Sequence, residues 1–372
     1  MKKHAIIPIF IPHQGCPNDC VFCNQKKITA RQPDVTMDEV RNTIETWLST
    51  LTGREGMETI EIAFFGGSFT GIPVEQQTEY LQIACEYKER GLIDKIHLST
   101  RPDYIDEMIL DNLQKYKVDV IELGVQSFDE EVLEAAGRGH NSACVYTACE
   151  LIKSYGFELG IQLMIGLPED SMEKCLYSAR EAVKIGPSIA RLYPTIVIED
   201  TELMNMYRNG SYTPLTSDEA VEITKEMYKI LTSAGINVIR IGLKSSDLIR
   251  EDGEIQGTTF HPAFRQLVEG AIAREKMEAL LAENLPGPGD PCWEPFTLKE
   301  LNFYSNDKWF SNMIGHKACN KKHFEAALPG WKINYKTMDM DDNLIGLAVA
   351  GSGVIMVKYS LEFNLNDNKE ET

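Results

Sequence analysis

The stretch Gly15-Cys16-Pro17-Asn18-Asp19-Cys20-Val21-Phe22-Cys23 brings three cysteines into eight residues, directly after an apolar run that predicts a first strand. Three thiolates on one short loop can bind a single inorganic centre. A structural zinc site usually takes four protein ligands, and His13 is the only nearby candidate for the fourth. An iron–sulfur cluster held by three cysteines leaves one iron open to an added ligand. The spacing therefore predicts a metal centre on Cys16, Cys20 and Cys23, and it leaves both kinds of centre open.

Beyond this loop, apolar β-rich runs alternate with stretches of helical period. Strands are predicted over residues 5–12, 59–65, 95–100, 118–125, 158–166 and 190–198. Helices are predicted over residues 36–51, 73–90, 105–115, 129–136 with 142–155, 171–185 and 217–234. Strands that each lead into a helix imply parallel pairing with right-handed crossovers. The six units are too few for a closed eightfold barrel. A partial barrel and a doubly wound sheet are the two candidate folds, and both collect functional groups where strands end.

The regular alternation of predicted strands and helices ends in the last third of the chain. A seventh strand is predicted over residues 236–242 and a helix over 264–281, followed by a stretch rich in proline and glycine. We predict a core over residues 1–245, an extension packing on that core over 246–284, a linker over 285–295 and a small α+β domain over 296–372.

Composition excludes several classes of protein. The 372 residues are 43% hydrophobic and 25% charged, which is typical of a soluble globular protein. The net charge of −19 argues against nucleic-acid binding over the whole surface. No apolar run reaches the roughly 18 residues of a membrane span, and the N-terminal apolar run is broken by Pro8 and Pro12. We therefore expect a cytoplasmic protein without a membrane partner. The nine cysteines cannot all pair, and the six outside the loop are expected to be structural thiols.

The cysteine spacing, with aromatic Phe22 before the last cysteine, resembles that of the radical S-adenosylmethionine (SAM) superfamily. This resemblance implies a partial (β/α)6 TIM-like barrel, which decides between the two candidate folds. It also implies a [4Fe-4S] cluster on the three cysteines, with SAM chelated to the open iron. One-electron cleavage of SAM then gives methionine and a 5′-deoxyadenosyl radical, and the electron comes from a donor such as ferredoxin or flavodoxin.

Strand ends carry the motifs that the resemblance assigns to SAM. Phe65-Gly66-Gly67-Ser68 looks like the glycine motif of the family, whose backbone binds the methionine amino group, and glycines allow such close approach. Gln126 and Gln162 would contact the ribose, and Arg138 the methionine carboxylate. From the sequence alone, the alternative for Arg138 is a surface salt bridge to Glu131 or Glu134.

The remaining SAM positions follow from the same resemblance. Gly166 ends the strand on the adenine side, and Phe22 and Ser99 complete the expected set. Oxygen-independent coproporphyrinogen oxidases carry a glutamate where this chain has Ser99, so their substrate chemistry is not carried over. No catalytic side chain is predicted; Tyr193 and His261 are cavity candidates without an assigned role.

Three further segments resemble the catalytic subunit of Elongator and its bacterial relatives that lack an acetyltransferase domain. These are Ser99-Thr100-Arg101-Pro102, Gly124-Val125-Gln126-Ser127 and Arg191-Leu192-Tyr193-Pro194-Thr195. The likeness covers residues 5–245 and implies tRNA or other RNA as one substrate class. The alternatives are a radical SAM enzyme with a small-molecule substrate, and a non-catalytic iron–sulfur or zinc sensor.

A basic block near the C-terminus is the predicted place for RNA. Six lysines against Glu325 give residues 308–336 a local charge of +5. Lys317, Lys321 and Lys322 follow a Gly-His pair in an order that weakly resembles a KH-type RNA module. A solvated basic face on a small structural domain is the favoured alternative.

Overall fold

The computed structural model describes residues 4–11, 16, 20–23, 35–51, 56–243, 255–256, 259–285, 299–342, 344–350 and 357–359. The chain forms two compact units, Met1–Ala220 with Ile230–Phe260, and Val221–Lys229 with His261–Thr372. The domain boundaries expected from the sequence stay predictions. His13 and all of the expected linker except Leu285 lie outside the described residues.

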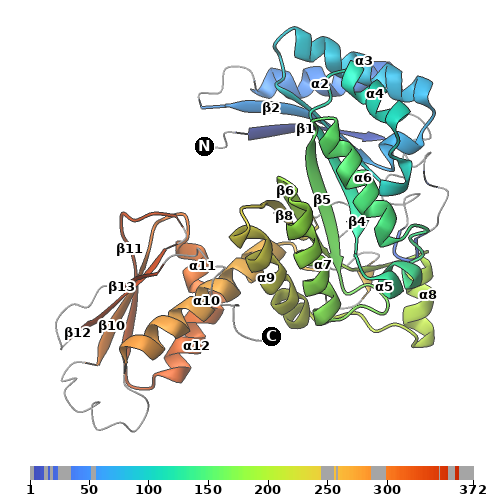
Figure 1. The fold of residues 1–372 in the computed structure, drawn as a ribbon. Helices are drawn as coiled ribbons and strands as arrows, with labels where there is room; N and C mark the ends of the chain where they lie inside the picture. The colour runs from blue at the N-terminus through green and yellow to red at the C-terminus, as the bar shows by residue number, and fades with distance from the viewer. Residues whose placement is uncertain are drawn as a thin grey trace. The chain divides into compact units, whose positions relative to one another are not determined.

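The first unit is built on a seven-stranded sheet in the order β1-β2-β3-β4-β5-β6-β8, with every pair parallel (Figure 1). The strands are β1 His4–Ile11, β2 Thr59–Gly66, β3 Lys95–Thr100, β4 Val120–Gln126, β5 Glu158–Ile165, β6 Ile189–Pro194 and β8 Asn237–Ile241. A short antiparallel pair, β7 Val197–Ile198 and β9 Ile255–Gln256, adds to this unit. The expected strand over residues 190–198 is thus interrupted after Pro194, where Thr195 donates its amide to the carbonyl of Ile165 at 2.8 Å.

Helices connect these strands in the expected order. They are α2 Met37–Leu51, α3 Val74–Glu89, α4 Glu107–Lys115, α5 Glu130–Ala135, α6 Ser142–Ser154, α7 Met172–Ile185, α8 Glu202–Asn209 and α9 Ser217–Ser233, with short 3₁₀ turns η1 Phe69–Gly71 and η2 Pro102–Tyr104. Most begin at a side chain that accepts a backbone amide, the preferred way to start a helix. These capping residues are Asp106, Asp129, Asn141, Ser171, Thr201 and Thr216. Figure 1 shows α6 and α7 running beside β4 and β5.

The two faces of the sheet differ in chemistry, because side chains alternate along each strand. One face is aliphatic and buried; it includes Ile7, Ile62, Leu98, Leu123, Ile161 and Leu192. The other carries Glu61, His97, Glu122, Gln162 and Arg191. The Arg191 guanidinium on β6 lies 4.8 Å from the ring centroid of Phe65 on β2, although three strands separate β2 from β6. Such a contact requires a curled sheet, and the expected partial barrel is confirmed.

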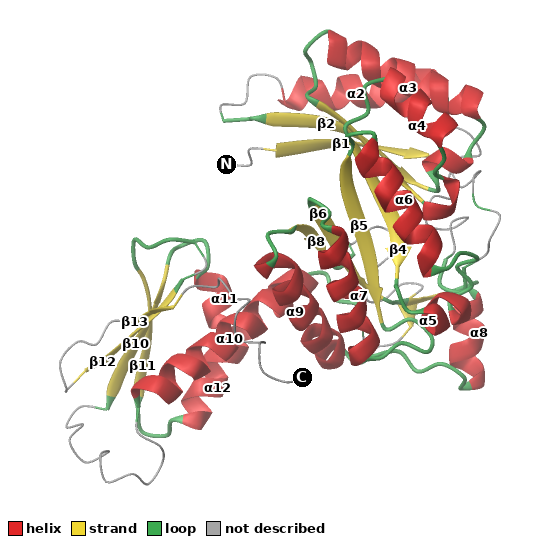
Figure 2. Ribbon diagram, in the orientation of Figure 1, coloured by secondary structure: helices red, strands yellow, loops and turns green. Residues whose placement is uncertain are grey.

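The second unit has a sheet in the order β11-β10-β12-β13. Its strands are β10 Glu300–Ser305, β11 Lys332–Thr337, β12 Ile345–Ala350 and β13 Val357–Tyr359, and only β10 and β11 pair in parallel. Its helices are α10 Phe264–Asn284, α11 Phe310–Ile314 and α12 Cys319–Ala327, with the turn η4 His316–Ala318. Figure 2 shows the three helices on one side of the sheet. Met277 and Leu280 of α10 share a core with Phe303 and Phe324. The small α+β C-terminal domain is confirmed.

Candidate active site

The cysteine loop is fixed to the carboxyl end of the barrel strands by backbone and apolar contacts. The amide of Val21 donates to the carbonyl of Ala136 at 3.1 Å, and its carbonyl accepts the amide of Leu203 at 2.7 Å. Phe22 packs against the buried cluster of Val132, Ala136 and Leu167, of which Leu167 lies just beyond the end of β5. Cys20 is buried, while Cys16 and Cys23 are half-buried. The described thiols are therefore held on the part of the barrel where functional groups of this fold collect.

Two buried arginines flank Cys20. Nη1 of Arg138 lies 3.3 Å from Cys20 Sγ and Nη1 of Arg101 lies 3.7 Å from it. Arg101 also makes two 2.8 Å hydrogen bonds to Asp103 and one to the carbonyl of Arg138. Burial acts to lower the pKa of Arg101, but Asp103 raises it above the ordinary value, so the guanidinium stays charged. Sequence reasoning gave Arg101 no role, although it lies in the quoted segment at the end of β3.

The same arginines act on Cys16. Burial raises the pKa of the Cys16 thiol, and the positive charges of Arg101 and Arg138 oppose that rise because they favour the thiolate. Arg138 is only 4% exposed, so it is not a surface residue, and Glu131 pairs instead with Lys174 at 2.6 Å. The two arginines thus offset part of the cost that burial imposes on a Cys16 thiolate.

The residues present fit an iron–sulfur cluster by donor set and charge. Three thiols on one loop, with two buried cations beside them, are suited to a group that needs thiolate ligands and carries negative charge. Within the described ranges, no three His, Cys, Asp or Glu side chains converge closely enough to hold a single metal ion. The fit therefore rests on the thiols and their arginine neighbours.

The turn after β2 brings its backbone close to β1. Gly66 has φ +115°, and a Cβ there would lie 2.4 Å from the carbonyl oxygen of Ile11, so only glycine fits. The next amide, from Gly67, donates to that same oxygen at 3.3 Å. The Ser68 hydroxyl is buried, lies 2.8 Å from Thr100 Oγ1 and accepts the Arg101 amide at 3.2 Å. The hydroxyl of Ser68 is thus used inside the protein to join the ends of β2 and β3.

The predicted ribose contacts, Gln126 and Gln162, lie together. Nε2 of Gln162 donates to Oε1 of Gln126 at 3.1 Å. The pairing of β4 with β5 shifts register between Gly124 and Gln126, and Gln126 has φ +72°. A bulge of this kind redirects a side chain at a strand end, and an unfavourable φ in a non-glycine residue is typical of functional sites.

Gly166 lies at the end of β5, as expected. It has φ +77°, and a Cβ at this position would lie 2.7 Å from Leu215 Cδ1, so both the backbone and the space favour glycine. The amide donates to Asp170 at 2.9 Å and the carbonyl accepts the Tyr212 hydroxyl at 2.6 Å. These bonds fix the loop that leads from β5 to α7.

A buried charge network, which sequence reasoning missed, crosses the inner face of the barrel. Glu122 lies 2.7 Å from Nε of Arg191 and 3.6 Å from Nε2 of His97, whose Nδ1 lies 3.2 Å from Glu61. Burial acts to lower the pKa of His97, but hydrogen bonds to Glu122 and Glu61 raise it overall. Ser99, expected near SAM, donates to Glu122 at 3.3 Å.

The second unit places the expected RNA-contacting lysines on η4 and α12. Lys317 and Lys322 have no acidic partner in the described part of the chain, whereas Lys321 lies 3.8 Å from Glu325. Two other lysines of the basic block, Lys308 and Lys332, pair with Asp342 and Glu300. The positive charge available to RNA is therefore smaller than the sequence count of +5.

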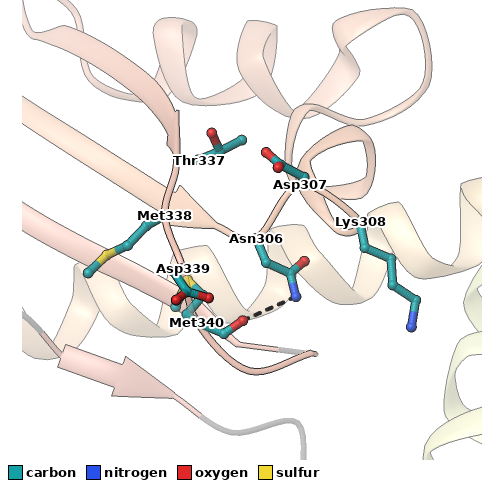
Figure 3. A pocket seen from close by; sticks show the side chains of 7 residues that line it. All are labelled: Asn306, Asp307, Lys308, Thr337, Met338, Asp339 and Met340. Atoms are coloured by element: carbon teal, nitrogen blue, oxygen red, sulfur yellow. Dashed lines mark hydrogen bonds between the residues drawn. The ribbon is translucent and has the colours of Figure 1, made fainter.

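A pocket of about 490 Å³ in the second unit lies between the loops after β10 and β11 (Figure 3). Asn306 Nδ2 donates to the Met340 carbonyl at 3.3 Å across it. Asp307 and Asp339 line the pocket, and the lining cation, Lys308, is paired with Asp342. This charge pattern does not suit a polyanion.

Among the described residues, no helix is long and apolar enough to span a membrane.

The sequence was compared with protein-family models and with known proteins. The Radical SAM superfamily model matches residues 10–182, and the Radical_SAM C-terminal domain model matches residues 187–274. The chain is 28% identical over 257 residues to a tRNA uridine(34) acetyltransferase of Methanocaldococcus jannaschii, covering 59% of this chain and 47% of that protein. It is 24% identical over 270 residues to human Elongator complex protein 3, covering 61% and 49%. The chain thus spans about half the length of these curated relatives.

A solved structure shares the fold. The archaeal Methanocaldococcus infernus Elp3 with an N-terminal deletion aligns with a TM-score of 0.58 at 22% identity, covering 74% of this chain and 64% of that chain. At this level of identity the likeness concerns the fold.

Proposed function

The chain belongs to the radical SAM superfamily, and from this premise we propose that it is an enzyme that cleaves SAM reductively at a [4Fe-4S] cluster and modifies tRNA. The single observation that carries the proposal is the set of Cys16, Cys20 and Cys23, with two buried arginines next to Cys20. A cluster with bound SAM would supply a 5′-deoxyadenosyl radical, so the protein needs few catalytic side chains of its own. Ferredoxin or flavodoxin is the expected electron donor, and the cytoplasm the expected compartment.

The residues around the thiols have distinct tasks in this proposal. The three cysteines would hold the cluster, and Arg101 and Arg138 would keep its thiolates anionic. Phe22 would exclude water from one side, because it packs into the apolar cluster beyond β5.

SAM would bind across the strand ends. The backbone of residues 66–68 would receive the methionine amino group, because Gly66 and Gly67 present no Cβ there. The positive charge of Arg138 would attract the methionine carboxylate. The joined amides of Gln126 and Gln162 would hold the ribose, with Gly166 beside the adenine and Ser99 completing the cavity.

The cluster is tested by replacing one ligand. Anaerobically reconstituted wild-type protein should contain about four irons per chain and form 5′-deoxyadenosine from SAM. Cys20→Ala should abolish the 5′-deoxyadenosine and lower the iron content. Cys149→Ala is the matched control, since burial raises the pKa of that thiol to about 12 and makes it an inert structural group. One zinc and no iron in the wild-type protein would instead support the sensor alternative.

The proposed tRNA substrate rests on the relatives. Uridine 34 is the first position to test, because an archaeal relative is named a tRNA uridine(34) acetyltransferase. A small-molecule substrate is the second candidate, favoured by the net charge of −19 and by the lysines that are already paired.

A charge-matched pair of variants separates these substrates. Lys317→Gln with Lys322→Gln removes two charges that lack an acidic partner among the described residues, and it should weaken tRNA binding and reduce its salt dependence. Lys308→Gln with Lys332→Gln removes two charges already paired with Asp342 and Glu300, and it should change binding little. Wild-type protein that binds no tRNA at low salt would favour the small molecule.

A further inference from the structure

An exposed aromatic side chain lies on the inner face of the barrel, at the end of β1. Phe10 is 59% exposed, while its neighbours Ile9 and Ile11 point to the opposite face and are buried. Phe10 pairs in register with Phe65 of β2, and the two ring centroids lie 6.5 Å apart. A large apolar ring left open on the concave face of a barrel is available to contact a ligand.

Arg191 extends this aromatic pair across the barrel. Its guanidinium lies 4.8 Å from the Phe65 centroid, within the range of a cation–π contact. Nη1 of the same guanidinium donates to the Tyr193 hydroxyl oxygen at 3.2 Å. Phe10, Phe65, Arg191 and Tyr193 therefore form a continuous series of contacts from β1 to β6.

The hydrogen bond from Arg191 determines whether the Tyr193 hydroxyl acts as a donor or an acceptor toward a ligand. Because the hydroxyl oxygen already accepts from Arg191, the Tyr193 O–H is left to donate. Tyr193 is half-buried, and no described residue accepts that hydrogen. Arg191 in turn is held by Glu122, 2.7 Å from its Nε, so the guanidinium cannot easily turn away.

We propose that Phe10, Phe65 and Tyr193 form a base-recognition wall for the substrate RNA. An unstacked base would lie against Phe10, and one of its carbonyl oxygens would accept the Tyr193 O–H. Arg191 is a positioning residue that acts through Tyr193. The proposal rests on the proposed tRNA function. The side chains expected to contact the SAM ribose lie on β4 and β5, whereas Phe10 lies on β1 and Tyr193 on β6, so these two side chains remain available to the substrate.

Base recognition has a chemical signature that charge attraction lacks. An aromatic ring can stack on any of the four bases, but the stacking is lost when the base is removed. Phosphate contacts remain when the base is removed, because they involve only the backbone. A carbonyl acceptor is present on uracil, cytosine and guanine but absent from adenine. The wall therefore predicts an affinity that falls when the base is removed while the backbone is kept.

The test uses the full-chain reconstituted protein with SAM and two tRNA transcripts, one with uridine and one with an abasic site at position 34. Wild-type protein should bind the uridine transcript about 10-fold more tightly, the value of one stacked base. Phe10→Leu should lose most of this ratio without changing the affinity for the abasic transcript. Trp47→Leu on α2 is the control, an exposed aromatic outside the barrel face, and should keep the ratio.

The hydroxyl is tested separately. Tyr193→Phe removes only the donor and should reduce the ratio several-fold, whereas Tyr177→Phe on α7 should not. Arg191→Lys should reduce the ratio as much as Tyr193→Phe, and the double variant should be no worse than either, because both act through one hydrogen bond. Additive losses would overturn the positioning role of Arg191.

The outcomes separate the wall from the tRNA function. Equal wild-type affinity for both transcripts would overturn the wall and leave the tRNA function in place. A Phe10→Leu variant that loses affinity for both transcripts equally would also overturn the wall. Wild-type protein that binds neither transcript would overturn both proposals.

Discussion

At the scale of single residues, the site depends on positions where the backbone adopts an unusual conformation. Gly66 combines a positive φ with a carbonyl oxygen 2.4 Å from any Cβ, and that oxygen belongs to Ile11, one strand away. Gln126 accepts an unfavourable φ of +72° at the end of β4. Such strain persists only where the surrounding structure enforces it.

Gly66→Ala should therefore lower the free energy of unfolding by more than the cost of the strained backbone, because the new Cβ also clashes with Ile11. Gly186→Ala is the control, since Gly186 also has a positive φ, of +71°, but open space around its Cβ position. We expect about 1 kcal/mol of destabilisation at Gly186, from the left-handed backbone. Gly66→Ala should cost more, and it should also weaken SAM binding. Denaturant unfolding and SAM titration measure the two effects; equal destabilisation of both variants would contradict the clash with Ile11.

At the scale of elements, the strands of the barrel are tied together by the network of Glu61, His97, Glu122 and Arg191. Each residue comes from a different strand, so the network spans β2, β3, β4 and β6. If His97 carries a proton, two positive charges balance two negative charges in a buried setting. Removing one partner of such a network is costly, because it leaves an uncompensated charge.

The network gives stability a defined dependence on pH. The folded pKa of His97 is raised, so its contribution is complete below the unfolded value of 6.5 and is lost as pH rises through the folded value. The free energy of unfolding should therefore fall with rising pH across this window. His97→Gln should flatten that fall, whereas His140→Gln should not, since burial lowers the pKa of His140 to about 4. A wild-type stability independent of pH above 6.5 would contradict a protonated His97.

The helices and strands also show which parts of the structure could be predicted from the sequence. The helices and strands of the first unit were predictable because their apolar periods are strong and their helices begin at capping side chains such as Asp129 and Thr216. The charge network was not, because Glu61 lies inside an otherwise apolar run and its partner His97 is on another strand. The thiols were predictable from local spacing, whereas Arg101 reaches Cys20 only through the fold.

At the scale of the whole molecule, the chain combines a radical SAM barrel with a small C-terminal unit. The fold of the barrel is confirmed by its sheet order and by the matched family. The basic block could be counted from sequence, but the pairing of Lys308 and Lys332 with acidic residues from other segments could not. The proposed RNA binding through this unit would accordingly depend on few lysines.

The proposal that the protein modifies tRNA by radical SAM chemistry is tested most directly by following a hydrogen atom from tRNA to the 5′-deoxyadenosyl group of SAM. A tRNA transcript made with fully deuterated uridine is incubated with the reconstituted enzyme, a reductant and SAM, and the 5′-deoxyadenosine is analysed by mass spectrometry. We expect 5′-deoxyadenosine that carries one deuterium and forms faster when tRNA is present. Unlabelled 5′-deoxyadenosine formed at the same rate with and without tRNA, or none at all, would contradict it.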